Sequence, residues 1–176
     1  MPRLPLIDPA AATGRVKEIF DGPLKGKGLN IFKAMANSPA ALDTYLGIAG
    51  ALHNGTLSPK EREVVGLAMG EKSGCEYCTA AHTVIGKSLG LSDSAAIAAR
   101  RGTGEDPKLA ALAKFVVALD EKGGSVSDAD LAAFIGAGYK VEQVPEVIAV
   151  YALQVFTNTF NIFNDTPLDF PAAPKV

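Results

Sequence analysis

The sequence has few of the features that mark several large classes of protein. Charged residues make up only 20% of its 176 residues, and 17 lysines and arginines nearly balance 19 aspartates and glutamates. Disordered chains combine high net charge with low hydrophobicity, so a chain that is 48% hydrophobic is expected to fold. No block of basic residues provides the electrostatic footprint of nucleic-acid binding. No run of 18 apolar residues predicts a membrane-spanning helix.

Cysteine is also scarce. Two cysteines are too few for a disulfide scaffold. The residues Met1 to Pro5 do not begin an apolar segment typical of a secretory signal, so we expect a cytoplasmic location. Both cysteines lie in one tetrapeptide, Cys75-Glu76-Tyr77-Cys78. In a cytoplasmic protein this pattern indicates redox chemistry or metal binding rather than a structural crosslink.

Helix signals dominate the rest of the chain, and alternating β-branched runs are almost absent. Ser58-Pro59-Lys60-Glu61, for example, is a capping box that predicts the start of a helix. Glycines just beyond the periodic segments predict where helices end. We therefore predict an all-α fold with a single domain over residues 1–176, and with segments 1–29 and the Pro-rich 165–176 as appendages. The predicted helices span about residues 30–37, 39–54, 59–73, 75–90, 93–102, 107–123, 128–136 and 142–164.

The predicted helix over 59–72 is apolar around its whole circumference. A helix without a polar face must be covered on all sides. Because a chain of 176 residues has little material to do this, we expect neighbouring subunits to cover the helix, and hence a homo-oligomer.

The strongest chemical signal joins the cysteine pair to two further residues. Cys75, Cys78 and His82 share one face if the helix includes all three. A thiolate is favoured in the first helical turn, and His82 can act as a base towards Cys78. Glu63 lies in the preceding helix near Gly66, a small residue that lets another helix come close. We expect Glu63 to be partly desolvated and within hydrogen-bond reach of His82 or Cys78, an arrangement that suits thiol peroxidase or disulfide-exchange chemistry.

Other interpretations of these residues stay open. The cysteine pair could be ordinary small core residues, with Glu61 as a cap and Arg62 on the solvent face of the helix. Zinc is a second alternative, since two cysteines and His82 provide three ligands, although a structural zinc site uses four. The other histidine, His53, is expected at a helix end. Haem attachment would need a histidine at Thr79, and a thioredoxin-like domain would need strands around the motif.

The pattern Glu63-x11-Cys75-x2-Cys78-x3-His82 resembles the core motif of the AhpD-like superfamily, which includes the carboxymuconolactone decarboxylase family. The resemblance covers roughly residues 40–170. It implies an AhpD-like helical bundle that usually assembles into trimers or hexamers. In the alkylhydroperoxidases of this superfamily, the second cysteine of the pair attacks the peroxide and the first resolves the sulfenic acid.

Carried over by position, the resemblance implies that Cys78 is peroxidatic and Cys75 resolving, with Glu63 and His82 as a proton relay. It implies a lipoyl-type dithiol as reductant, a small-molecule hydroperoxide as substrate, and no cofactor or metal. The residues alone leave the roles of the cysteines open, because the helix dipole favours Cys75 as the thiolate whereas the histidine favours Cys78. At the position between the cysteines, where the best-characterised alkylhydroperoxidases carry histidine, this chain has Tyr77.

These observations predict a thiol-dependent peroxidase or disulfide reductase of the AhpD type. One alternative is a carboxymuconolactone decarboxylase-like lactone enzyme that uses Glu63 and His82 without thiol turnover. The decarboxylases do not need a cysteine pair, so the presence of Cys75 and Cys78 argues against that activity. Another alternative is a non-catalytic, redox-sensing oligomer whose disulfide alters its assembly.

Overall fold

The computed structural model describes residues 1–104 and 106–176, and all regular secondary structure in these two stretches is helical. The all-α fold class is therefore confirmed. The elements in chain order are α1 (Gly14–Asp21), α2 (Asn30–Met35), α3 (Pro39–His53), α4 (Pro59–Ser73), α5 (Glu76–Ser88), α6 (Asp93–Arg100), α7 (Pro107–Glu121), α8 (Asp128–Gly136), a short 3₁₀ helix η1 (Val141–Gln143) and α9 (Val144–Asn164).

Most helices begin at the side-chain caps that the sequence predicts. Ser38, Ser58, Ser92, Asp106 and Ser127 each accept a hydrogen bond from a backbone N–H in the first turn of the helix that follows. Ser58 also forms the predicted capping box, in which the Glu61 carboxylate accepts from the Ser58 backbone N–H at 2.7 Å. These local bonds fix where α3, α4, α6, α7 and α8 start.

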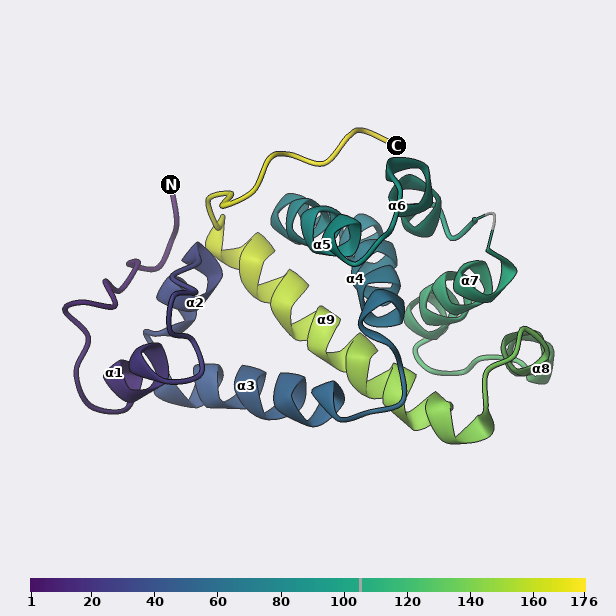
Figure 1. The fold of residues 1–176 in the computed structure, drawn as a ribbon, viewed down its shortest axis with the longest axis horizontal. Helices are drawn as coiled ribbons and strands as arrows, with labels where there is room; N and C mark the ends of the chain where they lie inside the picture. Colours follow the sequence, from purple (N-terminus) through teal and green to yellow (C-terminus); the bar gives the residue numbers. More distant parts are fainter. Residues whose placement is uncertain (105) are drawn as a thin grey trace.

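Helix α4 lies at the centre of the molecule (Figure 1). The hydrophobic residues of α4 between Val64 and Met69 are at most 1% exposed, because α5, α6, α7 and α9 pack around the helix. The expectation that the helix over 59–72 must be covered by neighbouring subunits is therefore wrong. The same chain surrounds it.

Glycines bring α4 and α5 close together. A Cβ atom at Gly70 would lie 3.2 Å from the Thr79 backbone nitrogen, and one at Gly66 would lie 2.5 Å from the His82 ring. Contacts this short leave no room for a larger residue at Gly66 without movement of the neighbour. The glycines thus set the separation at which residues of the two helices meet.

A second hydrophobic cluster covers the start of α5. It is formed by α1, α2 and α3, and its buried residues include Ile19, Phe20 and Phe32 together with Cys75 and Cys78. Helix α1, which the sequence patterns do not predict, contributes the first two of these. The cysteine pair thus lies beside the packed N-terminal helices.

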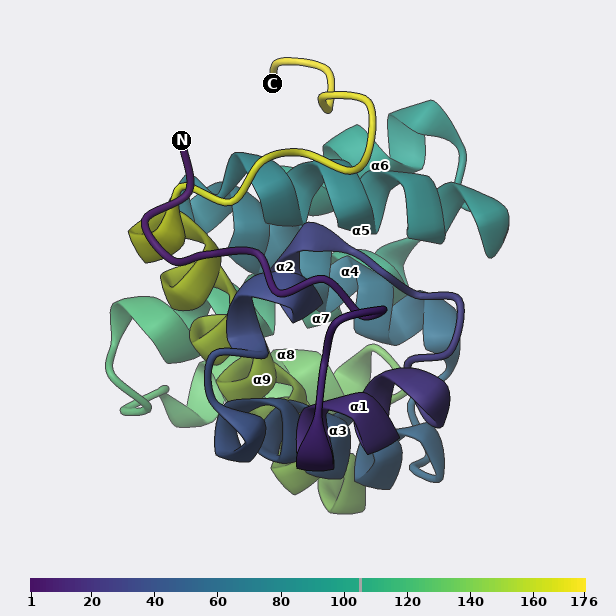
Figure 2. The ribbon, with the colours of Figure 1, turned by 90° about the vertical axis from the view of Figure 1, so that its left-hand side faces the viewer.

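Both terminal segments lie along the outside of this region (Figure 2). The Arg3 and Leu4 backbone N–H groups donate to Asn164, to its backbone and side-chain oxygens respectively. In the C-terminal segment, the Asp169 carboxylate accepts hydrogen bonds from the Tyr77 hydroxyl at 2.6 Å and from the Asn30 backbone N–H at 2.7 Å. The C-terminal segment is thereby held next to the residues between the two cysteines.

In the described part of the chain, no helix combines the length and apolarity needed to cross a lipid bilayer.

Candidate functional site

The cysteine pair forms the N-terminal end of α5. Cys75 is the N-cap residue, and its sulfur accepts a hydrogen bond from the Cys78 backbone N–H at 3.2 Å. The two cysteines are joined as a disulfide, with their Cα atoms 5.3 Å apart. Cys75 is 2% exposed and Cys78 is 3% exposed. The structure therefore presents the oxidised state of the pair, held in a protein interior.

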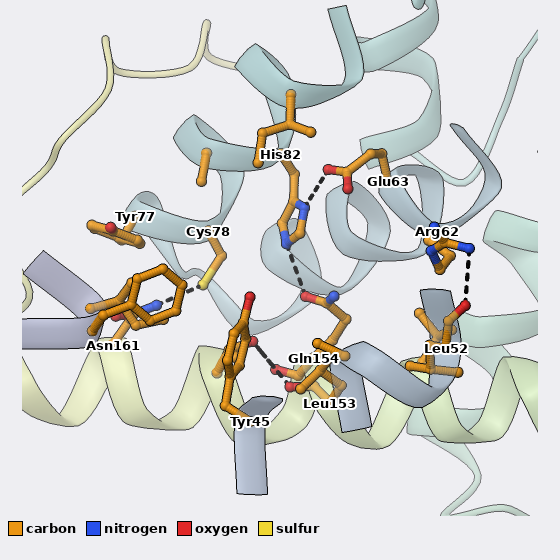
Figure 3. Close-up of a pocket in the computed structure, with 17 residues that line it drawn as sticks. Tyr45, Leu52, Arg62, Glu63, Tyr77, Cys78, His82, Leu153, Gln154 and Asn161 are labelled. Carbon is orange, nitrogen blue, oxygen red and sulfur yellow. Dashed lines mark hydrogen bonds and ion pairs between the residues drawn. The ribbon is translucent and has the colours of Figure 1, made fainter. Parts of the chain in front are cut away.

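His82 lies one turn further along α5, between α4 and α9 (Figure 3). Its Nδ1 is 2.7 Å from a Glu63 carboxylate oxygen, and its Nε2 is 3.0 Å from the side-chain oxygen of Gln154. The Glu63 and His82 side chains are 16% and 17% exposed, so the pair is largely shielded from water. The structure thus brings Glu63 within hydrogen-bond reach of His82, one of the two partners expected from the sequence.

The surroundings of His82 favour its protonated form. Burial acts to lower the pKa of His82, but the negative charge of Glu63 and the hydrogen bonds to Glu63 and Gln154 outweigh it. The net effect raises the pKa of His82 above its ordinary value of 6.5. With both ring nitrogens facing oxygen acceptors, an imidazolium can donate to Glu63 and Gln154 at once.

Cys78 contacts a different polar group from the one expected. From the sequence, His82 is expected to act as a base towards Cys78, whereas in the structure both His82 nitrogens are taken by Glu63 and Gln154. The ring leans onto α4 because Gly66 leaves space for it. The Cys78 sulfur instead lies 3.4 Å from the Asn161 side-chain nitrogen, which donates to it from α9.

Asn161 has a spare acceptor beside the sulfur. The residue is 3% exposed, and its side-chain oxygen has no hydrogen-bond partner among the described residues. Buried polar atoms are normally paired. The Asn161 amide therefore offers one bond to Cys78 and one free acceptor for a molecule next to it.

These side chains surround a cavity of about 220 Å³, which we call the inner cavity (Figure 3). Rings and aliphatic groups form most of its wall, whereas Glu63, Gln154 and Asn161 contact His82 or Cys78 within it. An apolar cavity with a few convergent polar groups is the usual form of a small-molecule site. Its lining includes Phe32, Tyr45, Glu63, Tyr77, Cys78, His82, Ile85, Gln154 and Asn161.

Sequence reasoning missed three residues of this site. Gln154 and Asn161 come from α9, whose only charged residue is Glu146. Buried amides spaced at 154, 158 and 161 on such a helix are a signal that could have identified them. The third is Arg62, which the sequence places on the solvent face. It lines the inner cavity and donates to the Leu52 and Leu57 carbonyls, because the α3–α4 connection folds back over it.

A metal site would need a cluster of ligands, and residues 1–104 and 106–176 contain no such cluster. No group of three or more His, Cys, Asp or Glu side chains in these stretches is arranged to hold an ion. The sulfurs of Cys75 and Cys78 are bonded to each other.

Comparison with known proteins finds one matching family model and several similar solved structures. Residues 39–121 match the model of the carboxymuconolactone decarboxylase family. No curated protein matches the chain. Three solved structures cover nearly all of it with 16–20% identity, a level at which the likeness shows the fold alone.

The first of these structures is an alkylhydroperoxidase AhpD core, an uncharacterised peroxidase-related protein from Ralstonia eutropha JMP134. It is 20% identical with a TM-score of 0.84, over 96% of this chain and 92% of that one. An uncharacterised peroxidase-related protein from Silicibacter sp. TM1040 is 19% identical with a TM-score of 0.76, over 97% and 91%. A cysteine-to-alanine variant of the debrominase Bmp8, in complex with 2,3,4-tribromopyrrole, is 16% identical with a TM-score of 0.74, over 96% and 94%.

Proposed function

We propose that this protein is a thiol-dependent peroxidase of the AhpD type, because residues 39–121 match the model of the carboxymuconolactone decarboxylase family and the chain has the AhpD-like helical fold. The observation that carries the proposal is the environment of Cys78. Its sulfur lies on a largely apolar cavity, beside an amide donor and next to the Glu63–His82 pair. Reduction of a hydroperoxide needs these three elements: a nucleophilic sulfur, a dry pocket and a proton donor.

In the proposed reaction the reduced Cys78 thiolate attacks the terminal oxygen of a hydroperoxide. The O–O bond breaks, and the departing alkoxide takes a proton and leaves as an alcohol. Cys78 becomes a sulfenic acid. The Cys75 thiol then attacks the Cys78 sulfur, water leaves, and the disulfide forms. A dithiol returns the pair to two thiols, so that each cycle reduces one hydroperoxide and oxidises one dithiol.

The Glu63–His82 pair supplies the proton for the departing alkoxide. The raised pKa of His82 favours its protonated form, and Glu63 holds the ring in place through Nδ1. Nε2 points towards Gln154 at the cavity wall, so this nitrogen is the one from which a proton can reach the substrate. Gln154 then acts as a positioning residue that orients the ring. The free Asn161 oxygen can accept the hydrogen of the terminal O–H group of the peroxide.

Turnover of cumene hydroperoxide with dihydrolipoamide tests this proposal. Dithiol consumption should require both cysteines, so the Cys75→Ser/Cys78→Ser double variant should lose all of it. A lactone decarboxylase would keep its activity in that variant. A redox sensor would show no turnover in the wild type and a change of oligomeric state on oxidation. Either of these results would contradict the peroxidase proposal.

A second candidate function is reductive dehalogenation of a flat aromatic compound. The observation that favours it is the set of rings in the inner cavity, from Phe32, Tyr45 and Tyr77, which could contact such a molecule beside Cys78. One structural neighbour is a debrominase whose structure contains a tribromopyrrole. Two thiols would supply two electrons, replacing C–Br by C–H and releasing bromide and a proton. Bromide release from 2,3,4-tribromopyrrole by the reduced protein tests this candidate.

We also propose that the chain assembles into a homo-trimer or homo-hexamer. Helix α4 does not support this assembly, because its own chain covers it. The support comes from the outer face of α9. Ile148, Val155 and Phe163 on that face are 44%, 38% and 53% exposed. An uncharged row of this kind on the longest helix is typical of an interaction surface.

A further inference from the structure

One tyrosine hydroxyl in the inner cavity has no partner among the described residues. Two tyrosines line the cavity, Tyr45 from α3 and Tyr77 from α5. The Tyr77 hydroxyl donates to the Asp169 carboxylate at 2.6 Å. The Tyr45 hydroxyl forms no hydrogen bond with a described residue, and it points towards the space between Cys78 and Gln154 (Figure 3). Tyrosine hydroxyls inside proteins usually have a partner, so this one is free to bond to a molecule in the cavity.

We propose that Tyr45 is a catalytic residue of the peroxidase reaction, which donates a hydrogen bond to the oxygen that leaves when Cys78 attacks an alkyl hydroperoxide. This inference rests on the proposed function and deepens it. The Glu63–His82 pair supplies the proton in that reaction, and Tyr45 adds a direct contact to the oxygen on which negative charge develops.

Packing holds the Tyr45 ring in place. The ring lies against both the core around α4 and the N-terminal cluster, and its centroid is 5.1 Å from that of Phe32. Helix α3, which carries Tyr45, starts at the Ser38 cap and packs against α2 and α9. A hydroxyl on a ring fixed in this way is oriented before the substrate arrives. Such preorganised donors stabilise developing charge well, because they need no reorganisation during the reaction.

The surroundings keep the Tyr45 hydroxyl protonated. Burial and the negative charge of Glu63 both raise the pKa of Tyr45 above its ordinary value of 10.0. The charge of Glu63 is itself offset by its partner His82 when the ring is protonated. The third charged side chain of the cavity wall, Arg62, donates to two backbone carbonyls. Tyr45 is therefore a neutral donor at neutral pH.

The polar groups of the cavity divide between the two oxygens of the peroxide. In the proposed reaction, Cys78 and Asn161 contact the terminal O–H group. The sulfur attacks along the O–O bond, so the leaving oxygen lies on the far side of the terminal oxygen from the sulfur. The Tyr45 hydroxyl points into the space beside Cys78 where that oxygen comes to lie (Figure 3).

The step balances with the groups already named. Cys78 takes the terminal oxygen and becomes a sulfenic acid, and the O–O bond breaks with its electron pair on the leaving oxygen. That oxygen accepts the Tyr45 hydrogen bond while it receives a proton from the Glu63–His82 pair. The alcohol then leaves, and Tyr45 is unchanged.

The contribution of Tyr45 should depend on the leaving group. An alkyl hydroperoxide releases an alkoxide, a strong base that concentrates its charge on one oxygen. A peroxy acid releases a carboxylate, a weak base that spreads its charge over two oxygens. Loss of one donor to a developing oxyanion typically slows a reaction by about 10²–10³-fold. Removal of the Tyr45 hydroxyl should therefore affect alkyl hydroperoxides strongly and peroxy acids little.

Stopped-flow oxidation of the reduced protein by cumene hydroperoxide and by peroxybenzoic acid tests this expectation. Both oxidants carry a phenyl ring, and they differ in the leaving group. Tyr45→Phe should slow oxidation by cumene hydroperoxide at least about tenfold, and oxidation by peroxybenzoic acid less than about threefold. Tyr151→Phe is the matched control, since it removes a hydroxyl that donates to Asp120 outside the cavity, and it should leave both rates unchanged.

The ratio of the two rates separates catalysis from structure. Altered packing, or an altered Cys78 thiol, would slow both oxidants alike. Alkylation by iodoacetamide in a Cys75→Ser background checks the Cys78 thiol alone, because the departing iodide needs no hydrogen-bond donor. Tyr45→Phe should leave this alkylation unchanged. Equal slowing with both oxidants, or no slowing with either, would overturn the catalytic role of Tyr45.

The wild-type rates distinguish this inference from the proposed function. If cumene hydroperoxide does not oxidise the reduced wild type, the peroxidase function is wrong, and the role of Tyr45 is wrong with it. If cumene hydroperoxide oxidises the wild type and Tyr45→Phe at the same rate, the peroxidase function remains and only the role of Tyr45 is wrong.

Discussion

At the scale of single residues, the site depends on how one imidazole ring is held. His82 contacts Glu63 through one nitrogen and Gln154 through the other, so the ring has a fixed orientation and a favoured charge. Gln154 lies 72 residues from His82 in the sequence. Asn161, which donates to the Cys78 sulfur, lies 83 residues from Cys78. Spacing along one helix predicts neighbours such as Cys78 and His82, but it holds no information about contacts between distant helices.

Removing the charge of Glu63 should change both titration and catalysis. In Glu63→Gln, burial of His82 persists while the attraction of the carboxylate is lost, so the pKa of His82 should fall. Loss of a proton relay typically slows a reaction by about 10²–10⁴-fold, and oxidation of Cys78 by peroxide should slow to a similar extent. NMR titration of the imidazole and stopped-flow oxidation measure the two effects.

Glu142→Gln is the matched control for this change, because Glu142 is exposed whereas Glu61 caps α4 and pairs with Lys108. If Glu63→Gln oxidises at the wild-type rate, Glu63 is only a structural partner of His82.

The same pair should make stability depend on pH. The folded-state pKa of His82 lies above 6.5, so the contribution of the Glu63–His82 pair is present below about pH 6.5 and is lost as the pH rises through the raised pKa. Wild type and Glu63→Gln should therefore differ more in free energy of unfolding below about pH 6.5 than at alkaline pH. Urea unfolding at a series of pH values measures the difference. A gap that widens towards alkaline pH would contradict this sign.

Asn161 should stabilise the reduced Cys78 thiolate. A hydrogen bond to a charged group contributes about 1.5–3 kcal/mol, so Asn161→Ala in a Cys75→Ser background should move the pH profile of thiol alkylation upward by at least roughly one unit. Asn158→Ala is the control, since Asn158 is equally buried on α9 but donates to Ser73. Identical alkylation profiles in the two variants would show that Asn161 does not act on the sulfur.

At the scale of elements, the close approach of α4 and α5 sets the position of His82. Gly66→Ala would place a Cβ atom 2.5 Å from the His82 ring. The ring or the helix that carries it must then shift, which disturbs the contact with Glu63, and overpacking of this kind costs about 1–3 kcal/mol. We expect lower stability together with slower oxidation of Cys78, measured by thermal unfolding and stopped-flow mixing.

Gly47→Ala in α3 is the matched control for Gly66→Ala, because nothing lies within 4 Å of the added Cβ atom. Replacing an unhindered helix glycine by alanine should stabilise the protein by about 0.5–1 kcal/mol. If both alanine variants are equally stable, the contact between Gly66 and His82 does not limit the packing of α4 and α5.

Helix boundaries are predictable to the extent that local side chains determine them. The serine and aspartate caps of α3, α4, α6, α7 and α8 act within three residues of the helix start, so their signals are legible in the sequence. Helix α1 has no side-chain cap and begins at Gly14 with a positive φ of 52°. Burial of Ile19 and Phe20 against other helices stabilises it, and that contribution comes from tertiary packing.

At the scale of the whole molecule, hydrophobic pattern predicts burial but not the identity of the covering surface. The apolar circumference of α4 indicates a buried helix, and the helix is buried. Whether its own chain or another subunit covers it depends on the topology of α5, α6, α7 and α9, which the pattern of α4 does not contain. For the exposed residues on the outer face of α9, the hydrophobic pattern likewise does not identify the surface that would cover them.

Self-association through α9 gives the last prediction. In solution the wild type should have three or six times the 18.2 kDa mass of one chain, as measured by light scattering. Val155→Lys should shift the protein towards monomer, because each copy would place an unpaired charge in an apolar interface. Val141→Lys changes a more exposed valine outside α9 and should leave the mass unchanged. A wild-type monomer at micromolar concentration would exclude assembly, and equal masses for all three proteins would exclude this face. Since Val155 is already exposed, circular dichroism of the variant should show an intact fold, so that a fall in mass reports the contact between subunits.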